Sequence, residues 1–453
     1  MNKKQETRIN VSIVAGEFLM NAATVILLTY ASYCYTDLAH ISNEMMSSAM
    51  FIVSVIGFVF SLFSGAIVQN TRSKQGMYRP WLILSTTLVA VAGLFMLFHK
   101  STMLVNCIVI SIAYGLASCL YDISYLAKYG IYEKMSLGDS TRRDTYSAMS
   151  AIGLNAGYIL YGAAFLPVVS FLGKGNEANG FTYTQIILIA FTILGVAIIG
   201  KVSKPYDTSN VSESVTREKV NLVEMLKSVF RNKLAVVVSL GNVIRYTGFF
   251  TFFYLLIYVC DSVVGSIYAY SIAMVISSVA GIIGAMLSPV IIKMVGGRKK
   301  AASIMTICYG LCFVALGIFG QTFWGLMITY TIATILQYAY DTIDMMMYLD
   351  AGEYYYNKTG RDTRAYCMNV ANIVGKIAQA LSAIALGAVL VGVNYTEGII
   401  LDAAGKTTLT MAAGISAGVP AMIYGVLLIL FHRVSDAELT RCINENAEKD
   451  AAL

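Results

Sequence analysis

Residues 45–98 read MMSSAMFIVSVIGFVFSLFSGAIVQNTRSKQGMYRPWLILSTTLVAVAGLFMLF, and this stretch decides the fold. It holds two apolar runs, 45–69 and 80–98, each close to the roughly 20 residues that cross a bilayer as an α-helix. The loop between the runs carries three basic residues, and basic loops between membrane spans stay on the cytoplasmic side. The stretch therefore predicts two transmembrane helices joined by a short cytoplasmic loop.

The same pattern recurs along the whole chain of 453 residues. Only 13% of the residues are charged, whereas soluble domains carry about 25%. The sequence therefore predicts an all-α membrane protein with twelve transmembrane helices. The predicted spans are 10–36, 45–69, 80–98, 102–126, 145–173, 181–203, 234–260, 266–295, 301–319, 322–349, 364–394 and 409–432. The first run is too long for the apolar part of a signal peptide, so we expect it to stay as the first span.

The basic residues predict the orientation of these spans. Of the 32 Lys and Arg residues, 27 lie in the segments that are cytoplasmic when the N-terminus is inside. The outer loops hold Lys100, Lys174 and Lys406, and two more, Arg245 and Lys376, lie within spans. We expect a multi-pass protein of the plasma membrane with both termini in the cytoplasm. The net charge of +6 reflects this topology, so the lipid bilayer and not nucleic acid is the expected partner.

Cysteine and histidine give no pattern typical of a metal site, a cofactor or a catalytic centre. The eight cysteines include no CxxC pair and lie mostly within spans, which indicates neither a disulfide framework nor a metal cluster. The three histidines lie at the margins of the spans. We expect no metal, no cofactor and no enzymatic activity.

The second half of the chain repeats landmarks of the first half in the same order. SYCYTD (32–37) corresponds to LIYVCD (256–261), and YDIS (121–124) corresponds to YDTID (340–344). These matches predict two six-helix bundles, 1–203 and 234–432, in the arrangement of the major facilitator fold. A cytoplasmic linker, 204–233, with a short amphipathic helix would join the bundles, and a cytoplasmic tail, 433–453, would follow the second one.

Several motifs resemble one transporter family over nearly the whole chain. They are GEFLMN…YCYTD (16–37), NTRSKQGMYRPW (70–81), YDISY (121–125), and LDAGEYYYNKTGRDTRAY…NIVGK (349–376) with GVNY (392–395). In these motifs the chain resembles the glycoside–pentoside–hexuronide:cation symporters, of which the melibiose carrier is a member. The resemblance implies sugar uptake across the plasma membrane, driven by Na⁺, H⁺ or Li⁺. It also implies substrate contacts at Asn21, Asp122, Asn372 and Lys376.

The chain departs from this family pattern at two places. Where melibiose-type carriers have two cation-binding aspartates in the second span, this sequence has Gly57 and Ser61. Na⁺ prefers charged oxygen ligands, so their absence favours H⁺ over Na⁺ as the coupling ion. The arginine usual early in the fifth span is also replaced, with Tyr146 nearest in register.

Polar residues at membrane depth are costly, and they usually face a cavity or a partner side chain. They gather in the first and fourth spans of each half, which line the central cavity of this fold, and in the eleventh span. Amide, carboxylate and basic groups suit sugar hydroxyls, and aromatic rings suit the apolar face of a pyranose. The predicted substrate-binding residues are Glu17, Asn21, Asp122, Tyr125, Arg245, Asn372 and Lys376.

Two further roles are predicted for charged residues. Asp122 is the first candidate for proton coupling and Glu17 the second, because a carboxyl group removed from water can load and release a proton. Gate or structural ion pairs are expected at Arg72, Asp341, Asp344, Asp350, Glu353 and Arg361. For Arg245 the sequence leaves open a substrate contact or an ion pair with Asp341 or Asp344.

Taken together, these patterns predict a secondary transporter that takes up a sugar or glycoside by alternating access. H⁺ is favoured over Na⁺ as the coupling cation, and we expect a monomer. Two alternatives stay open at this point. One is an uncoupled facilitator, and the other is a transporter of the same fold for a non-sugar solute, such as an amphipathic molecule or a lipid.

Overall fold

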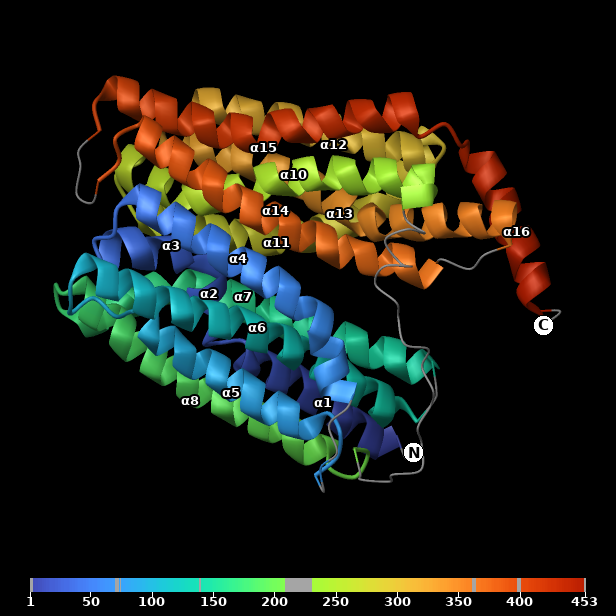
Figure 1. Cartoon of the computed structure of the whole chain (residues 1–453), viewed down its shortest axis with the longest axis horizontal. Helices are drawn as coiled ribbons and strands as arrows, with labels where there is room; N and C mark the ends of the chain where they lie inside the picture. The colour runs from blue at the N-terminus through green and yellow to red at the C-terminus, as the bar shows by residue number, and fades with distance from the viewer. Residues whose placement is uncertain are drawn as a thin grey trace. The chain divides into compact units, whose positions relative to one another are not determined.

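A computed structural model describes residues 3–69, 73, 75–137, 140–207, 230–360, 364–396 and 401–451, and these residues form helices without strands (Figure 1). Their contacts divide the chain into two compact units. The first holds α1 (Lys3–Met20), α2 (Thr24–Thr29), α3 (Ala31–Tyr33), η1 (Cys34–Leu38), α4 (Asn43–Gln69), α5 (Arg79–Phe95), α6 (Met103–Ser136), α7 (Ser140–Gly173) and α8 (Glu177–Ser203). The second holds α10 (Lys233–Tyr258), η2 (Val259–Val263), α11 (Tyr268–Val295), α12 (Arg298–Phe319), α13 (Phe323–Thr359), α14 (Arg364–Gly392), α15 (Ala403–Phe431) and α16 (Asp436–Ala451).

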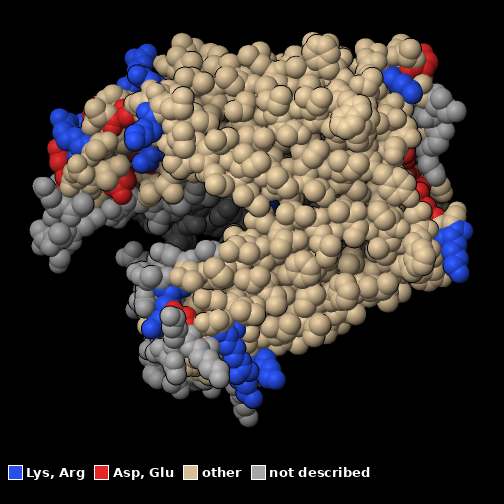
Figure 2. Space-filling view, turned by 180° about the vertical axis from the view of Figure 1, so that it is seen from behind, with Lys and Arg blue, Asp and Glu red and all other residues tan. Residues whose placement is uncertain are grey.

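Long apolar helices make up most of both units. Within the described residues, nine helical segments are long and apolar enough to cross a membrane. Their outward faces carry exposed apolar side chains, such as Ile52 and Ile56 on α4 and Met286 and Val290 on α11. On the face drawn in Figure 2, the charged residues lie toward the helix ends and the surface between them is uncharged. This distribution is that of helices whose middle lengths face lipid. The predicted amphipathic linker helix lies almost entirely outside the described residues.

Packing within each unit follows a simple scheme. In the first unit α1 packs on α7 and α8, while α6 packs on α4 and α5. In the second unit α10 packs on α14 and α15, and α13 packs on α11 and α12. The core of the first unit is built from small and branched residues of α1, α5, α6 and α8, among them Ile13, Leu82, Ala127 and Val196.

The first predicted span is broken in the middle. α1 ends at Met20, a turn covers residues 21–23, and the chain continues through short helical pieces to Leu38. The break leaves the N–H of Ala23 without a backbone partner among the described residues, and such a group must find a partner where no water is present. Thr192 Oγ1 accepts a hydrogen bond from the Ala23 N–H at 3.1 Å, and Gln185 Nε2 donates one to the Ala23 carbonyl at 3.3 Å. Side chains of α8 therefore stabilise the break.

The two segments matched in sequence, 32–37 and 256–261, share a local structure. Each runs into a π-helical turn, η1 in the first unit and η2 in the second. A π-turn widens the helix by one residue and is uncommon. Its occurrence at both places agrees with the repeat that the sequence indicates.

An aspartate that follows a long helix caps another helix in each unit. Asp207, just after α8, accepts hydrogen bonds from the backbone N–H groups of Met77, Tyr78 and Arg79 at 3.1, 2.9 and 2.8 Å, where α5 begins. Gly76 has a φ of +101°, and a Cβ there would collide with Asp207. The loop between α4 and α5 therefore needs its glycine to let the carboxylate reach the helix end.

Asp436 has the same role in the second unit. It lies at the start of α16, directly after α15, and its Oδ1 accepts a hydrogen bond from the Lys299 N–H at 3.3 Å in the first turn of α12. A glycine, Gly297, again lies beside the carboxylate, and a Cβ at this position would collide with it. The start of the third long helix is thus anchored in the same way in both units.

We predict that Asp207→Ala lowers the free energy of unfolding by about 2 kcal/mol, because a buried helix end loses three bonds to a carboxylate. Asp402→Ala is the matched control, since Asp402 caps α15 through one bond to the Gly405 N–H at an exposed site. Thermal unfolding of the purified protein in detergent should show a clearly larger loss for Asp207→Ala. Equal losses would contradict the assigned role.

Candidate functional site

Among the described residues, each unit buries a cluster of charged and hydroxyl-bearing side chains between its long helices. The cluster of the first unit is centred on Glu17 of α1, and the cluster of the second unit is centred on Arg245 of α10. Both residues are almost completely removed from solvent. At membrane depth such groups need partners within the protein, and the partners show what each cluster can do.

Glu17 is surrounded by donors from α6, from α7 and from the turn that follows α1. Lys128 Nζ of α6 lies 3.3 Å from its Oε2, and Asn21 Nδ2 donates to the same oxygen at 3.0 Å. Its Oε1 accepts from Ser150 of α7 at 2.8 Å and from the hydroxyl of Tyr132. With an ion pair and three further donors, the carboxylate of Glu17 is fully satisfied. The cluster therefore ties α1, α6 and α7 together.

Lys128 corrects the sequence analysis. The predicted span 102–126 ended before it, and it was counted with the cytoplasmic loop that follows. In the structure α6 continues to Ser136, and Lys128 is buried against Glu17. Tyr125 and Tyr129 lie beside it, with ring centroids 5.3 and 5.1 Å from its Nζ. The signal was present in the sequence, since tyrosines recur at helical spacing, at 121, 125, 129 and 132, beyond the predicted end of the span.

The rings of Tyr125 and Tyr129 are the more accessible part of this region. Their centroids are 4.8 Å apart, and the residues are 49% and 37% exposed. Asp122 lies one turn before Tyr125 on α6 and is partly buried. The structure therefore places a carboxylate and two aromatic rings along one length of α6, next to the buried ion pair.

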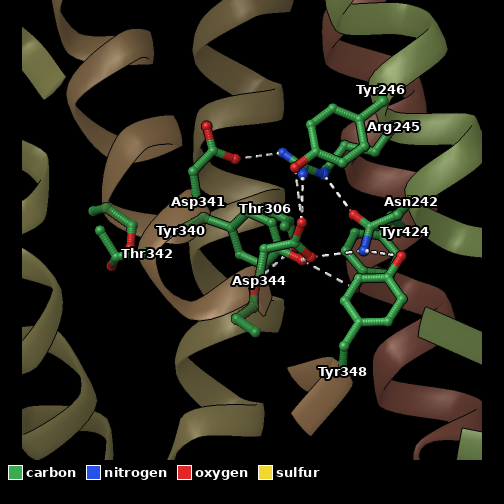
Figure 3. Close-up of polar contacts among 12 residues, drawn as sticks. Asn242, Arg245, Tyr246, Thr306, Tyr340, Asp341, Thr342, Asp344, Tyr348 and Tyr424 are labelled. Carbon is green, nitrogen blue, oxygen red and sulfur yellow. Dashed lines mark hydrogen bonds and ion pairs between the residues drawn. The ribbon is translucent and has the colours of Figure 1, made fainter. Parts of the chain in front are cut away.

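The second cluster is built around the guanidinium group of Arg245 (Figure 3). Its Nη1 donates to Asp341 Oδ1 at 2.8 Å, and its Nη2 donates to Asp344 Oδ2 at 3.2 Å. Its Nε donates to Asn242 Oδ1 at 2.9 Å. The guanidinium carbon lies 3.9 Å from the ring centroid of Tyr246, a cation–π contact. Arg245 thus pairs with both aspartates that the sequence offered as alternatives.

Asp344 is held by donors from two helices. Asn242 Nδ2 and the Tyr340 hydroxyl donate to its Oδ1 at 2.6 and 2.9 Å, and the Tyr246 hydroxyl donates to its Oδ2 at 2.8 Å. The hydroxyl groups of Tyr340 and Tyr424 are 2.9 Å apart and extend the network to α15. The hydrogen bonds of this cluster join α10 to α13 and α15. A neutral side chain at position 344 would weaken the hydrogen bonds to Asp344.

A third group of contacts lies at one end of the second unit. Arg298 of α12 pairs with the buried Asp350 of α13, with Nη1 at 2.6 and 2.8 Å from the two carboxylate oxygens. Asn446 of α16 donates to Glu353 Oε2 at 2.6 Å. Lys358 pairs with Glu438 at 3.2 Å, and this hydrogen bond raises the pKa of Lys358. The contacts of Asn446 and Glu438 therefore hold α16 against the C-terminal part of α13.

The other predicted site residues are placed as follows. Asn21 is buried at the break after α1, where its amide is used by Glu17. Lys376 is partly buried on α14 of the second unit. Arg72, Arg361 and the side chain of Asn372 lie outside the described residues. Among the side chains that the structure describes, no group of three His, Cys, Asp or Glu residues could hold a metal ion.

Gly57 and Ser61, the two positions where the family resemblance led us to look for cation-binding aspartates, lie on α4. Ser61 Oγ donates to the Phe58 carbonyl of its own helix at 2.7 Å, and a side chain at Gly57 would meet open space. Beyond Glu44 in its first turn, the sequence of α4 contains no carboxylate. The helix therefore offers a cation no charged ligand at these two positions.

We predict that Lys128→Met lowers the free energy of unfolding by about 3 kcal/mol, because it leaves the charge of Glu17 buried without its counter-ion. The double variant Glu17→Gln/Lys128→Met removes both charges and should lose less than Lys128→Met alone. Unfolding in detergent by circular dichroism measures both. Arg441→Ala, which breaks an exposed pair with Glu445, is the control and should change the stability little.

Comparison with known proteins gives a family and a fold. The model of the family described as "MFS/sugar transport protein" matches residues 12–435. A lactose permease of Lactobacillus delbrueckii subsp. bulgaricus is 23% identical, over 92% of this chain and 66% of its own length. A raffinose carrier protein of Pediococcus pentosaceus is 22% identical, over 83% of this chain and 58% of its own length. The chain thus spans less than two thirds of the length of these two relatives.

A crystal structure of the nucleoside transporter NupG has a similar fold. Its TM-score is 0.64 with 16% sequence identity, and the similarity covers 96% of this chain and 100% of that one. At this level of identity the likeness concerns the fold alone. The family match confirms the resemblance noted in the sequence motifs.

Proposed function

The chain belongs to the MFS/sugar transport protein family, and from this premise we propose that it takes up a sugar or glycoside by alternating access. The observation that carries the proposal is the family match over residues 12–435. Two relatives named lactose permease and raffinose carrier protein support it, because each aligns with most of this chain. The buried polar clusters add physical support, since such groups at membrane depth are typical of transport pathways.

The proposed architecture has twelve transmembrane helices in two six-helix bundles, 1–203 and 234–432. Nine spans are the apolar segments described above, and the other three are the broken helix from α1 to η1, the shorter α5 and the more polar α13. A cytoplasmic linker, 204–233, joins the bundles, and a cytoplasmic tail, 433–453, follows the second. Both termini face the cytoplasm, and the protein lies in the plasma membrane as a monomer.

Residues proposed to contact the substrate are found in each of the two bundles. Glu17, Asn21 and Arg245 already bind neighbouring side chains, so we assign them to holding together the helices of their own bundle. Direct contact with the sugar is assigned first to Asp122 and Tyr125 of α6 and to Asn372 and Lys376 of α14. The half-exposed ring of Tyr125 offers a face for the apolar side of a pyranose, and Asp122 offers an acceptor for hydroxyl groups.

H⁺ is proposed as the coupling ion in preference to Na⁺. The support is the lack of charged ligands at Gly57 and Ser61 of α4, because Na⁺ would lose its main partners there. Asp122 remains the first proposed coupling residue and Glu17 the second. An uncoupled facilitator is the second candidate function, and the same missing carboxylates favour it. Transport of a non-sugar solute is the remaining alternative.

Uptake into proteoliposomes tests the proposal. The purified full chain is reconstituted, and the entry of labelled lactose and raffinose is measured without a gradient, with an inward Na⁺ gradient and with an inward proton gradient. We expect accumulation above the external concentration with the proton gradient alone. Equilibration without accumulation would favour the facilitator. Entry of neither sugar, in vesicles that contain folded protein, would contradict the proposal for these two sugars.

We predict that Tyr125→Ala lowers the initial rate of this uptake about tenfold, because an aromatic contact worth about 1.4 kcal/mol is lost. Tyr183→Ala is the matched control, since Tyr183 is 50% exposed but lies on α8. Its uptake should equal that of the unaltered protein. Equal losses in the two variants would remove Tyr125 from the site.

A further inference from the structure

The cluster around Arg245 holds more negative than positive charge. The ion pairs described for it join one guanidinium group to two carboxylates, Asp341 and Asp344. The tyrosine hydroxyls that complete the network are neutral at physiological pH. With both aspartates ionised, the cluster carries one uncompensated negative charge among buried side chains. An uncompensated charge in an apolar medium is costly, and binding one proton removes it.

The two aspartates differ in how they are held. Asp344 accepts hydrogen bonds from Asn242, Tyr246 and Tyr340 in addition to Arg245, and its side chain is 7% exposed. Four donors therefore hold its two oxygens in place. Asp341 accepts one of its bonds from Arg245, and its side chain is 27% exposed. Asp341 is therefore the aspartate of the pair that is accessible to solvent and that can exchange a proton with it.

Gln337 supplies a second observation. It lies four residues before Asp341 on α13, so that both side chains occupy one face of the helix. It is 1% exposed, and among the described residues its Oε1 has no hydrogen-bond partner. A carboxylic acid at 341 can donate to an amide oxygen, whereas a carboxylate accepts from the amide NH₂. An amide at this position can therefore bind either form of Asp341.

The other ionisable groups in contact with the cluster come from four helices. They are Arg245 and Tyr246 on α10, Tyr309 on α12, Tyr338, Tyr340 and Tyr348 on α13, and Tyr424 on α15. Lys376 is on α14, which packs against α10 and α13. Arg245 keeps its charge at any physiological pH, and the tyrosines titrate far above neutrality in water. Of the two carboxylates, Asp341 is the one whose exposed fraction favours exchange of a proton with solvent.

We propose that Asp341 is the proton-carrying residue of the second unit, in a step that rests on the proposed sugar uptake. A proton from water binds the carboxylate of Asp341 and converts it to a carboxylic acid. The ion pair between Arg245 and Asp341 is lost, while Arg245 stays paired with Asp344. The charge of the cluster changes from −1 to zero, and the neutral cluster passes through the occluded state at lower cost. Release of the proton on the other side restores the pair.

This assignment has a counterpart in the repeat. Asp341 follows a tyrosine in YDTID, as Asp122 does in YDIS. The coupling residue first proposed from the sequence and the residue proposed here thus occupy corresponding positions in the two halves. In the structure Asp341 is bonded to a guanidinium group that also holds a second carboxylate.

Infrared difference spectroscopy of the full-length protein in detergent tests the proposal without a sugar. A protonated carboxyl group has its own carbonyl stretching band, which disappears on ionisation. Spectra of the unaltered protein, recorded from about pH 5 to about pH 9, should contain such a band that is lost as the pH rises. Asp341→Asn should remove it, and Asp341→Glu should restore it. Asp402→Asn, at an exposed helix cap, is the control and should leave it unchanged.

Transport provides the second readout. In proteoliposomes, Asp341→Asn should reach the same final level of labelled lactose with and without an inward proton gradient, whereas Asp341→Glu should respond to the gradient. Persistence of the infrared band in folded Asp341→Asn, or its loss in Asp122→Asn instead, would overturn the proposal. If the unaltered protein does not take up lactose, the proposed substrate fails, and the infrared result still decides the role of Asp341.

Discussion

The structure depends on the rule that a charge buried in a membrane protein must find its partner inside the protein. In the first unit an acid on α1 pairs with a base on α6, and in the second a base on α10 pairs with an acid on α13. The first and fourth long helices of each half are thus linked by an ion pair, with the sign of the charges reversed between the halves. Because the surrounding hydroxyl and amide groups satisfy the remaining lone pairs, these charges can be buried without leaving unpaired acceptors.

The backbone obeys the same requirement. The break after α1 is possible because Thr192 and Gln185 of α8 bind backbone groups of the buried Ala23. Asp207 caps the N-terminal end of α5 and Asp436 that of α12. Each carboxylate lies next to a glycine, where a Cβ would collide with it. Side chains from outside a helix therefore complete its hydrogen bonds wherever the helix is interrupted.

The sequence predicted the apolar helices, the all-α class and the family, because each depends on patterns that a window of residues contains. It also singled out Glu17, Arg245, Asp341 and Asp344, since charges at membrane depth are conspicuous. It did not predict that Lys128 is the partner of Glu17, because local hydropathy ends the span before this residue, and only the packing of α6 against α1 shows its burial. The unequal roles of the two aspartates likewise follow from contacts across helices.

The most direct test of the account is the pH of a lightly buffered suspension of proteoliposomes when lactose is added. Sugar entry together with protons would make the outer medium more alkaline, and a protonophore would abolish the change. This is the result that the account predicts for the unaltered protein. Entry of labelled lactose without any change in the external pH would contradict coupling to protons, and with it the function assigned to the charge on Asp341.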